Sequence, residues 1–207
     1  MKRNILFSIL CAGILAGMIF TTGCGKKDTN PENHFTYNDT TYSLSQGFIS
    51  SAQIYDSLYS HTVLILSDGF TVVWDANDPM AIDSITGKGN VLLFNLIGLS
   101  EDGLEDGTYE AALQTKKSLV LPNDKTWIYG SAYMDYTVIG DEESGSNVSL
   151  INGTVKVKSL GNNQYEFTFD VTSVDIIKLT GFFKGTFQSI KMNERKSYDT
   201  HSILNRL

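Results

Sequence analysis

The stretch INGTVKVKSLGNNQYEFTFDVTSVDIIKLTGFFKGTFQSI, residues 151–190, decides the fold of this chain. Near its start Val155 and Val157 alternate with lysines, which is the period of two expected for a strand with one buried face. Beyond a Gly-Asn-Asn turn, the next run places four apolar side chains on one face: Tyr165, Phe167, Phe169 and Val171. A third strand follows over 177–190. These runs predict an antiparallel meander with one face on a core and the other in water.

The same period of two extends back to Phe35. Asn38-Asp39 lies between short alternating runs and predicts a tight hairpin turn. The runs 61–66 (HTVLIL) and 70–74 (FTVVW) are separated only by Ser-Asp-Gly, which predicts a second hairpin between them. The most apolar run, 91–99 (VLLFNLIGL), predicts a central strand buried on both faces.

Two polar stretches interrupt the strands. Residues 75–90 are rich in Asp, Asn and Gly and predict a loop of unusual length, and residues 141–147 (DEESGSN) predict another loop. Nine or ten strands and no convincing helix then make up an all-β domain over 35–191, followed by a polar C-terminal tail over 192–207. Burying both apolar faces requires an antiparallel β-sandwich or a flattened β-barrel, with a calycin-like barrel as an alternative.

The N-terminus has the three parts of a secretory signal peptide, followed by a cysteine. Lys2 and Arg3 precede an apolar run of about 16 residues, which is shorter than the roughly 20 that a membrane-spanning helix needs. Thr21-Thr22-Gly23-Cys24 then resembles a bacterial lipobox, although the usual leucine three residues before the cysteine is Thr21 here. We therefore expect a lipoprotein signal peptide over 1–23 and lipidation of Cys24; the alternative is an anchor helix that is never cleaved.

Residues 24–34 are polar and predict a tether between the lipid and the domain. Acyl chains on Cys24 would hold the protein at a membrane, since each buried methylene contributes about 0.8 kcal/mol. We expect a cell-envelope location, at the outer membrane, with the inner and outer faces both open.

Charge and cysteine usage exclude several classes of protein. The formal net charge is -7, whereas binding to nucleic acid requires clustered Lys and Arg, so no nucleic-acid partner is expected. The two cysteines, Cys11 and Cys24, both lie near the N-terminus, and the domain therefore has neither a disulfide framework nor a thiolate metal site.

The leader with TTGC, the segments FTYNDTTYSL and LEDGTYEA, and the strands INGTVKV, YEFTFDV and LTGFFKGTF together resemble Bacteroidetes putative lipoproteins of unknown function. That resemblance covers most of the chain but carries no site motif. It implies an anchored all-β protein, in some cases a calycin-like barrel that binds apolar ligands. It also implies candidate O-glycosylation at Ser57 and Ser84, each of which lies in an Asp-Ser-apolar triplet.

The residues that could support metal binding or catalysis form no recognised pattern. The three histidines, His34, His61 and His201, lack the paired spacing of a zinc site. Side chains with oxygen atoms that could bind calcium gather in two segments without the spacing of an EF-hand loop: Asp75, Asn77, Asp78 and Asp83, and then Glu101, Asp102, Glu105 and Asp106. There is no Gly-x-Ser-x-Gly motif, and the 23 acids do not single out a glycosidase pair. We expect no catalytic residue, metal or cofactor.

Aromatic residues are the best candidates for ligand contact, because exposed Trp and Tyr commonly stack on sugars. Trp74 borders the expected long loop, and Trp127 is followed by Tyr129. The alternative is that most rings fill the core. The sequence therefore predicts a non-enzymatic binding or surface-interaction module for a carbohydrate or a small apolar ligand. The rivals are a structural or assembly subunit of a surface complex and a hydrolase.

Overall fold

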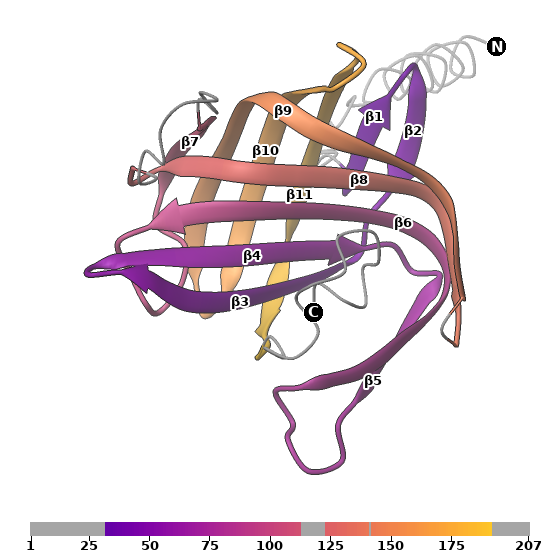
Figure 1. The fold of residues 1–207 in the computed structure, drawn as a ribbon, viewed down its shortest axis with the longest axis horizontal. Helices are drawn as coiled ribbons and strands as arrows, with labels where there is room; N and C mark the ends of the chain where they lie inside the picture. The colour runs from indigo at the N-terminus through magenta and orange to yellow at the C-terminus, as the bar shows by residue number, and fades with distance from the viewer. Residues whose placement is uncertain (1–31, 113–122, 141, 192–207) are drawn as a thin grey trace, which may run out of the picture. The chain divides into compact units, whose positions relative to one another are not determined.

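The computed structural model describes residues 32–112, 123–140 and 142–191 (Figure 1). The expected signal peptide over 1–23, Cys24 and the expected C-terminal tail over 192–207 lie outside this part of the chain. The described residues contain no helix, and so none that is long and apolar enough to cross a membrane. They form eleven strands: β1 (His34–Tyr37), β2 (Thr40–Ser43), β3 (Gln46–Tyr55), β4 (Leu58–Leu66), β5 (Phe70–Trp74), β6 (Ile82–Gly98), β7 (Gly107–Ala111), β8 (Thr126–Ile139), β9 (Glu142–Gly161), β10 (Gln164–Ser173) and β11 (Lys178–Ser189).

The expected meander is confirmed as β9, β10 and β11. Phe167 pairs with Val157 on one side and with Phe183 on the other, and both pairings are antiparallel. Asn162 and Asn163 both have positive φ, which suits a tight hairpin turn between β9 and β10. The expected turn at Asn38-Asp39 has the same geometry, with φ of 48° and 61°.

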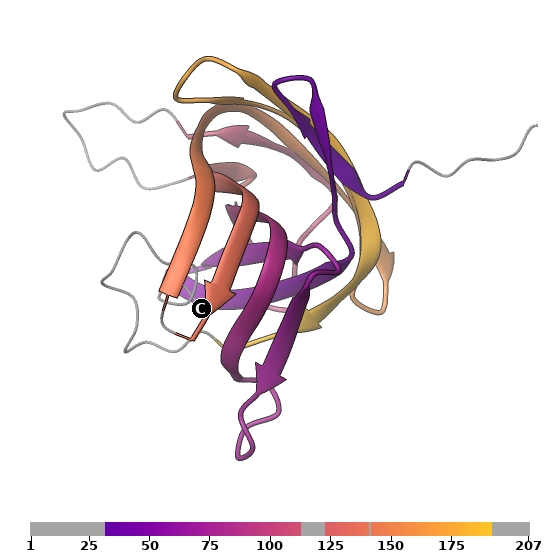
Figure 2. The same cartoon turned by 90° about the vertical axis from the view of Figure 1, so that its right-hand side faces the viewer.

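Strand pairing closes the sheet into a ring. Starting from β3, the neighbours in order are β4, β6, β8, β9, β10 and β11, and β11 then pairs with β3. The β11–β3 pairing is parallel and short, from Phe187↔Gly47 to Ser189↔Ile49. A second parallel pair joins β7 to β8, so the sheet is mixed, although most of its pairings are antiparallel as the sequence predicted. The result is the expected all-β fold in its flattened-barrel form (Figures 1 and 2).

The pairing of β6 contradicts two predictions made from the sequence, a hairpin and a loop. Its second half, Val91–Gly98, pairs with β4, and its first half, Ile82–Gly87, pairs with β5. The expected hairpin between β4 and β5 is therefore wrong. The two strands do not pair with each other, because each pairs with a different half of β6. The expected loop over 75–90 shrinks to 75–81 for the same reason, since hydrogen bonds to β5 and β8 hold the Gly-rich part of the segment extended. A one-residue register shift beside Asn90 marks a bulge, with the extra residue in β8.

The polar segment after the β8–β9 turn is also a strand. β9 begins at Glu142, and its first residues pair with the end of β8, for example Glu142 with Ile139. The expected loop over 141–147 is therefore wrong for all but residue 141, which lies outside the described residues. Backbone bonds to β8 decide the conformation here, and the weak strand propensity of Gly, Ser and Asn does not prevent it.

The core has two parts, one on each face of β4, β6 and β8. The first draws side chains from strands all round the ring and fills the interior with aromatic rings, including Phe94, Trp127, Phe167, Phe169 and Phe183. The second lies on the opposite face and includes Phe48, Leu64, Phe70, Leu93 and Tyr133. The strand predicted over 91–99 is thus confirmed as buried on both faces up to Gly98, because its side chains from Val91 to Phe94 alternate between the two clusters, whereas Leu99 lies beyond the strand and is exposed.

Candidate functional site

The most distinctive outward feature is the β5–β6 hairpin, which extends away from the ring (Figures 1 and 2). Phe70, Val72 and Trp74 point toward the second core cluster, whereas Thr71 and Val73 point outward. The Trp74 ring is partly exposed and lies 6.1 Å from the Phe48 ring, centroid to centroid. An indole at this position presents part of its surface to solvent while its other contacts hold it in place.

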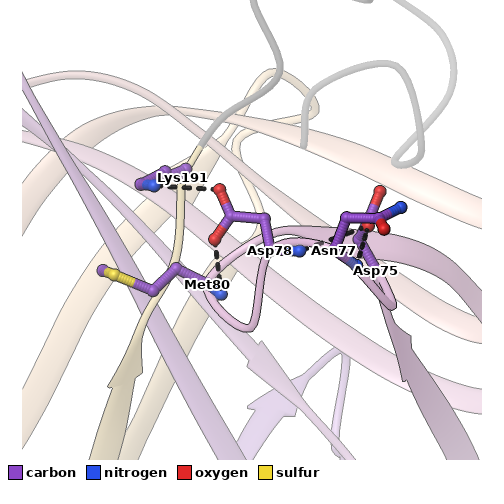
Figure 3. Close-up of polar contacts among 5 residues, drawn as sticks. All are labelled: Asp75, Asn77, Asp78, Met80 and Lys191. Carbon is purple, nitrogen blue, oxygen red and sulfur yellow. Dashed lines mark hydrogen bonds and ion pairs between the residues drawn. The ribbon is translucent and has the colours of Figure 1, made fainter.

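The loop that follows Trp74 is held by its own polar groups (Figure 3). Asp75 Oδ1 accepts hydrogen bonds from the backbone N–H groups of Asn77 at 2.6 Å and of Asp78 at 3.3 Å. Asp78 Oδ1 accepts one from Met80 N at 3.0 Å, and its Oδ2 forms an ion pair with Lys191 Nζ at 2.9 Å. These bonds lower the pKa of the Asp78 carboxyl, chiefly through Lys191.

Backbone bonds complete the loop. Asp75 N donates to Ala81 O at 2.9 Å, and Ala81 N donates to Asp78 O at 3.0 Å. The residue after β11 joins in, because Lys191 N donates to Met80 O at 2.8 Å. Trp74 therefore adjoins a loop whose backbone is already held in place by hydrogen bonds. A binding surface of this kind loses little conformational entropy when a ligand arrives.

The same contacts account for the acidic residues of this loop. Asp75 and Asp78 are engaged by backbone amides and by a lysine, and Asp83 lies in β6. Over the described residues no group of three or more His, Cys, Asp or Glu side chains is placed to hold a metal ion. In the second acidic segment, Glu105 Oε2 accepts a bond from Leu99 N at 3.1 Å.

Trp127 and Tyr129 do not form one surface. Trp127 pairs with Leu96 and Tyr129 with Asn95, which leaves Ile128 as an extra residue in β8. This bulge turns the two rings to opposite faces of the sheet. Trp127 is only 2% exposed and belongs to the interior cluster, where its Nε1 donates to Gly153 O at 3.1 Å, so the expectation that it contacts an external ligand is wrong. Tyr129 packs against the second cluster.

The two candidate glycosylation serines differ in setting. Ser57 is exposed in the turn between β3 and β4, where an enzyme can reach its hydroxyl. Ser84 is half-buried within β6, where it pairs with Val73. Only Ser57 has the exposed-turn setting that modifying enzymes commonly use.

A polar pair that the sequence did not predict joins the buried His61 of β4 to the exposed Ser51 of β3. His61 is fully buried, and its Nδ1 lies 2.8 Å from Ser51 Oγ. Its Nε2 has no hydrogen bond of normal geometry with the described residues. Burial lowers the His61 pKa, and the nearby Glu105 carboxylate and Ser100 backbone oppose this only in part. A regular hairpin centred on residues 56–57 would place Ser51 opposite Thr62. The bulge between Gln53 and Tyr55 shifts the register by one residue and brings Ser51 opposite His61, so the local sequence carried no signal for this pair.

The arm formed by β8 and β9 carries a shallow depression of about 300 Å³ lined by Thr137, Ile139, Glu142, Glu143 and Ser144. Glu142 and Glu143 are neighbours in a strand, so their side chains leave the backbone toward opposite faces. That geometry does not aim two carboxylates at one bond, as a glycosidase requires.

The chain was compared with protein families, with curated proteins and with solved structures. No family model matches the chain, and neither a curated protein nor a solved structure matches it.

Proposed function

We propose that this chain is a lipid-anchored protein of the cell envelope, at the outer membrane, that acts as a non-enzymatic binding module. The anchoring part rests on the leader and on Cys24 of the TTGC segment. The binding part rests on one observation: a partly exposed indole, Trp74, adjoins a loop that is already ordered by its own hydrogen bonds.

A carbohydrate fits this surface better than an apolar small molecule. Inside the ring, aromatic side chains such as Phe94 and Phe169 pack against each other with centroids 5.9 Å apart, so an apolar ligand there would have to displace core residues. A sugar can instead stack on the exposed part of Trp74 and meet the polar groups of the adjoining loop.

The anchoring test compares the full chain with its Cys24→Ser variant in a bacterial host. We expect the wild-type protein in the membrane fraction, with a fatty-acylated N-terminus by mass spectrometry, and the variant released from that fraction. Retention of Met1 on a membrane-bound chain would contradict the lipid anchor.

The binding test applies the purified mature chain to a glycan array and repeats the positive spots with variants. We expect Trp74→Ala to abolish binding and Trp74→Phe to keep part of it, because the phenyl ring still offers a stacking face. Tyr55→Ala is the matched control, because that ring is exposed on a different hairpin. Equal loss in Trp74→Ala and Tyr55→Ala, or no positive spot at all, would reject the carbohydrate site.

A further inference from the structure

The turn between β10 and β11 exposes an isoleucine in a backbone conformation that isoleucine disfavours. Ile176 is 83% exposed, and its φ is +62°. Val174, two residues earlier, is also exposed, and so is Ile151 on the neighbouring strand β9. Ile151 is the extra residue of a bulge opposite the Thr172–Ser173 step, which brings it close to the turn in the sheet. We call Ile151, Val174 and Ile176 the apolar tip.

Hydrogen bonds hold this turn in one conformation. Ser173 N donates to Ile177 O at 2.9 Å, and Ile176 N donates to Ser173 O at 2.9 Å. The buried Ser173 hydroxyl oxygen also accepts a bond from Ile177 N at 3.2 Å, and Val174 N donates to Ser149 O at 3.0 Å. The left-handed conformation of Ile176 is therefore imposed by a well-bonded turn.

At two comparable turns the chain has residues that adopt positive φ with less strain. Asn38-Asp39 and Asn162-Asn163 hold the positive φ positions of two other hairpins, and Asn and Asp tolerate that region best after Gly. Among the described non-glycine residues with positive φ, Ile176 is the only β-branched one. An isoleucine here costs backbone strain and also exposes apolar surface to water. Strain and exposure at the same residue indicate a contact made outside the chain.

Charges around the tip indicate what that contact is. Asp175 lies between Val174 and Ile176, and Lys178 is neutralised by Asp170 in an ion pair of 3.0 Å. The β1–β2 turn, with Asp39, lies beside the tip, because β1 pairs with β11 up to Tyr37↔Leu179 (Figures 1 and 2). The apolar tip therefore carries a net negative rim.

We propose that the apolar tip docks into another protein, in an apolar cleft bordered by Lys or Arg side chains. A second copy fits poorly, because it would present the same aspartates to the rim. A bilayer fits less well, because inserting Val174 and Ile176 would carry the Asp175 carboxylate toward the hydrocarbon. This inference does not depend on the glycan site or on the lipid anchor.

The test places a photo-crosslinking residue, p-benzoylphenylalanine, at position 151 of the full chain in its own organism, with the same residue at position 139 as the control. Ile139 is also a highly exposed isoleucine, at 70%, but it is the last residue of β8 and has no positive φ. Mass spectrometry then identifies the crosslinked peptide. The variants Ile176→Asn and Asp175→Lys are compared in the same background, and thermal unfolding is measured for each purified chain.

We expect a discrete protein adduct at 151 that is absent at 139, with a crosslinked peptide that is apolar and flanked by Lys or Arg. Ile176→Asn and Asp175→Lys should each reduce that adduct at least about tenfold, as expected for central interface residues. Ile176→Asn should also raise the unfolding temperature, which separates lost docking from lost folding. Adducts only to lipid, adducts only to a second copy, or equal adducts at 151 and 139 would each overturn the proposal.

Discussion

The Ser51 hydroxyl and the His61 imidazole face each other across the β3–β4 hairpin, with Oγ 2.8 Å from Nδ1. Because His61 is buried, its pKa in the folded protein is below the value of 6.5 that applies to the unfolded chain. The folded state thus binds fewer protons at His61 than the unfolded chain does. The contribution of His61 to the free energy of unfolding is therefore fully present above pH 6.5 and is lost as the pH falls below that value.

We predict that the free energy of unfolding decreases between pH 7.5 and pH 5 more in the wild-type protein than in His61→Gln. Urea denaturation at the two pH values measures the difference. His34→Gln, which alters a histidine at the start of β1, is the control and should keep the wild-type dependence. Equal pH dependence in wild type and His61→Gln would show that this imidazole does not control acid stability.

Trp127 and Trp74 should differ in their contribution to stability. Trp127→Ala removes a fully buried ring that contacts Phe94 edge-on, with centroids 6.2 Å apart, and should cost about 3–5 kcal/mol. Trp74→Ala should cost much less, because its ring is partly exposed. Urea denaturation of both variants tests this order, and a loss for Trp127→Ala no larger than that for Trp74→Ala would contradict the buried position.

Gly181 should not tolerate a side chain. A Cβ at this position would clash with His34 O, a backbone atom that cannot move without disturbing the β1–β11 pairing. Gly181→Ala should destabilise the fold by about 1–3 kcal/mol, the usual cost of overpacking. Gly98→Ala is the matched control, because its Cβ would meet His61 Nε2 only at an ordinary 3.4 Å. Thermal unfolding compares the two, and similar melting temperatures would contradict the close strand approach at Gly181.

The Asp78–Lys191 ion pair should order the β5–β6 loop more than it stabilises the whole fold. Both side chains are substantially exposed, so we expect little change in global stability for Lys191→Met. Amide hydrogen exchange should instead accelerate at Met80 and Ala81, and binding to any glycan that depends on Trp74 should weaken. Lys178→Met, which breaks the similar Asp170 pair at the far hairpin, should leave exchange at Met80 unchanged.

The strands themselves were predictable, because side-chain alternation is local. The meander of β9 to β11, the turn at Asn38-Asp39 and the doubly buried run 91–99 follow from the period of two and from turn chemistry, which depend on residues close in the chain. Trp74 could be selected as a candidate for ligand contact for the same reason, since it adjoins a polar loop. The leader and Cys24 depend on the sequence alone and lie outside the described residues.

Only the tertiary structure decided which strands pair and which way each ring points. Backbone hydrogen bonds are the same for every residue, so nothing local shows that β6 pairs with both β4 and β5, or that β11 closes the ring on β3 in parallel. One extra residue at Ile128 reverses the alternation, which buries Trp127 and separates it from Tyr129. The left-handed backbone of Ile176 could not be predicted from the sequence either. A β-branched residue predicts negative φ, and only the hydrogen-bonded turn imposes the positive value.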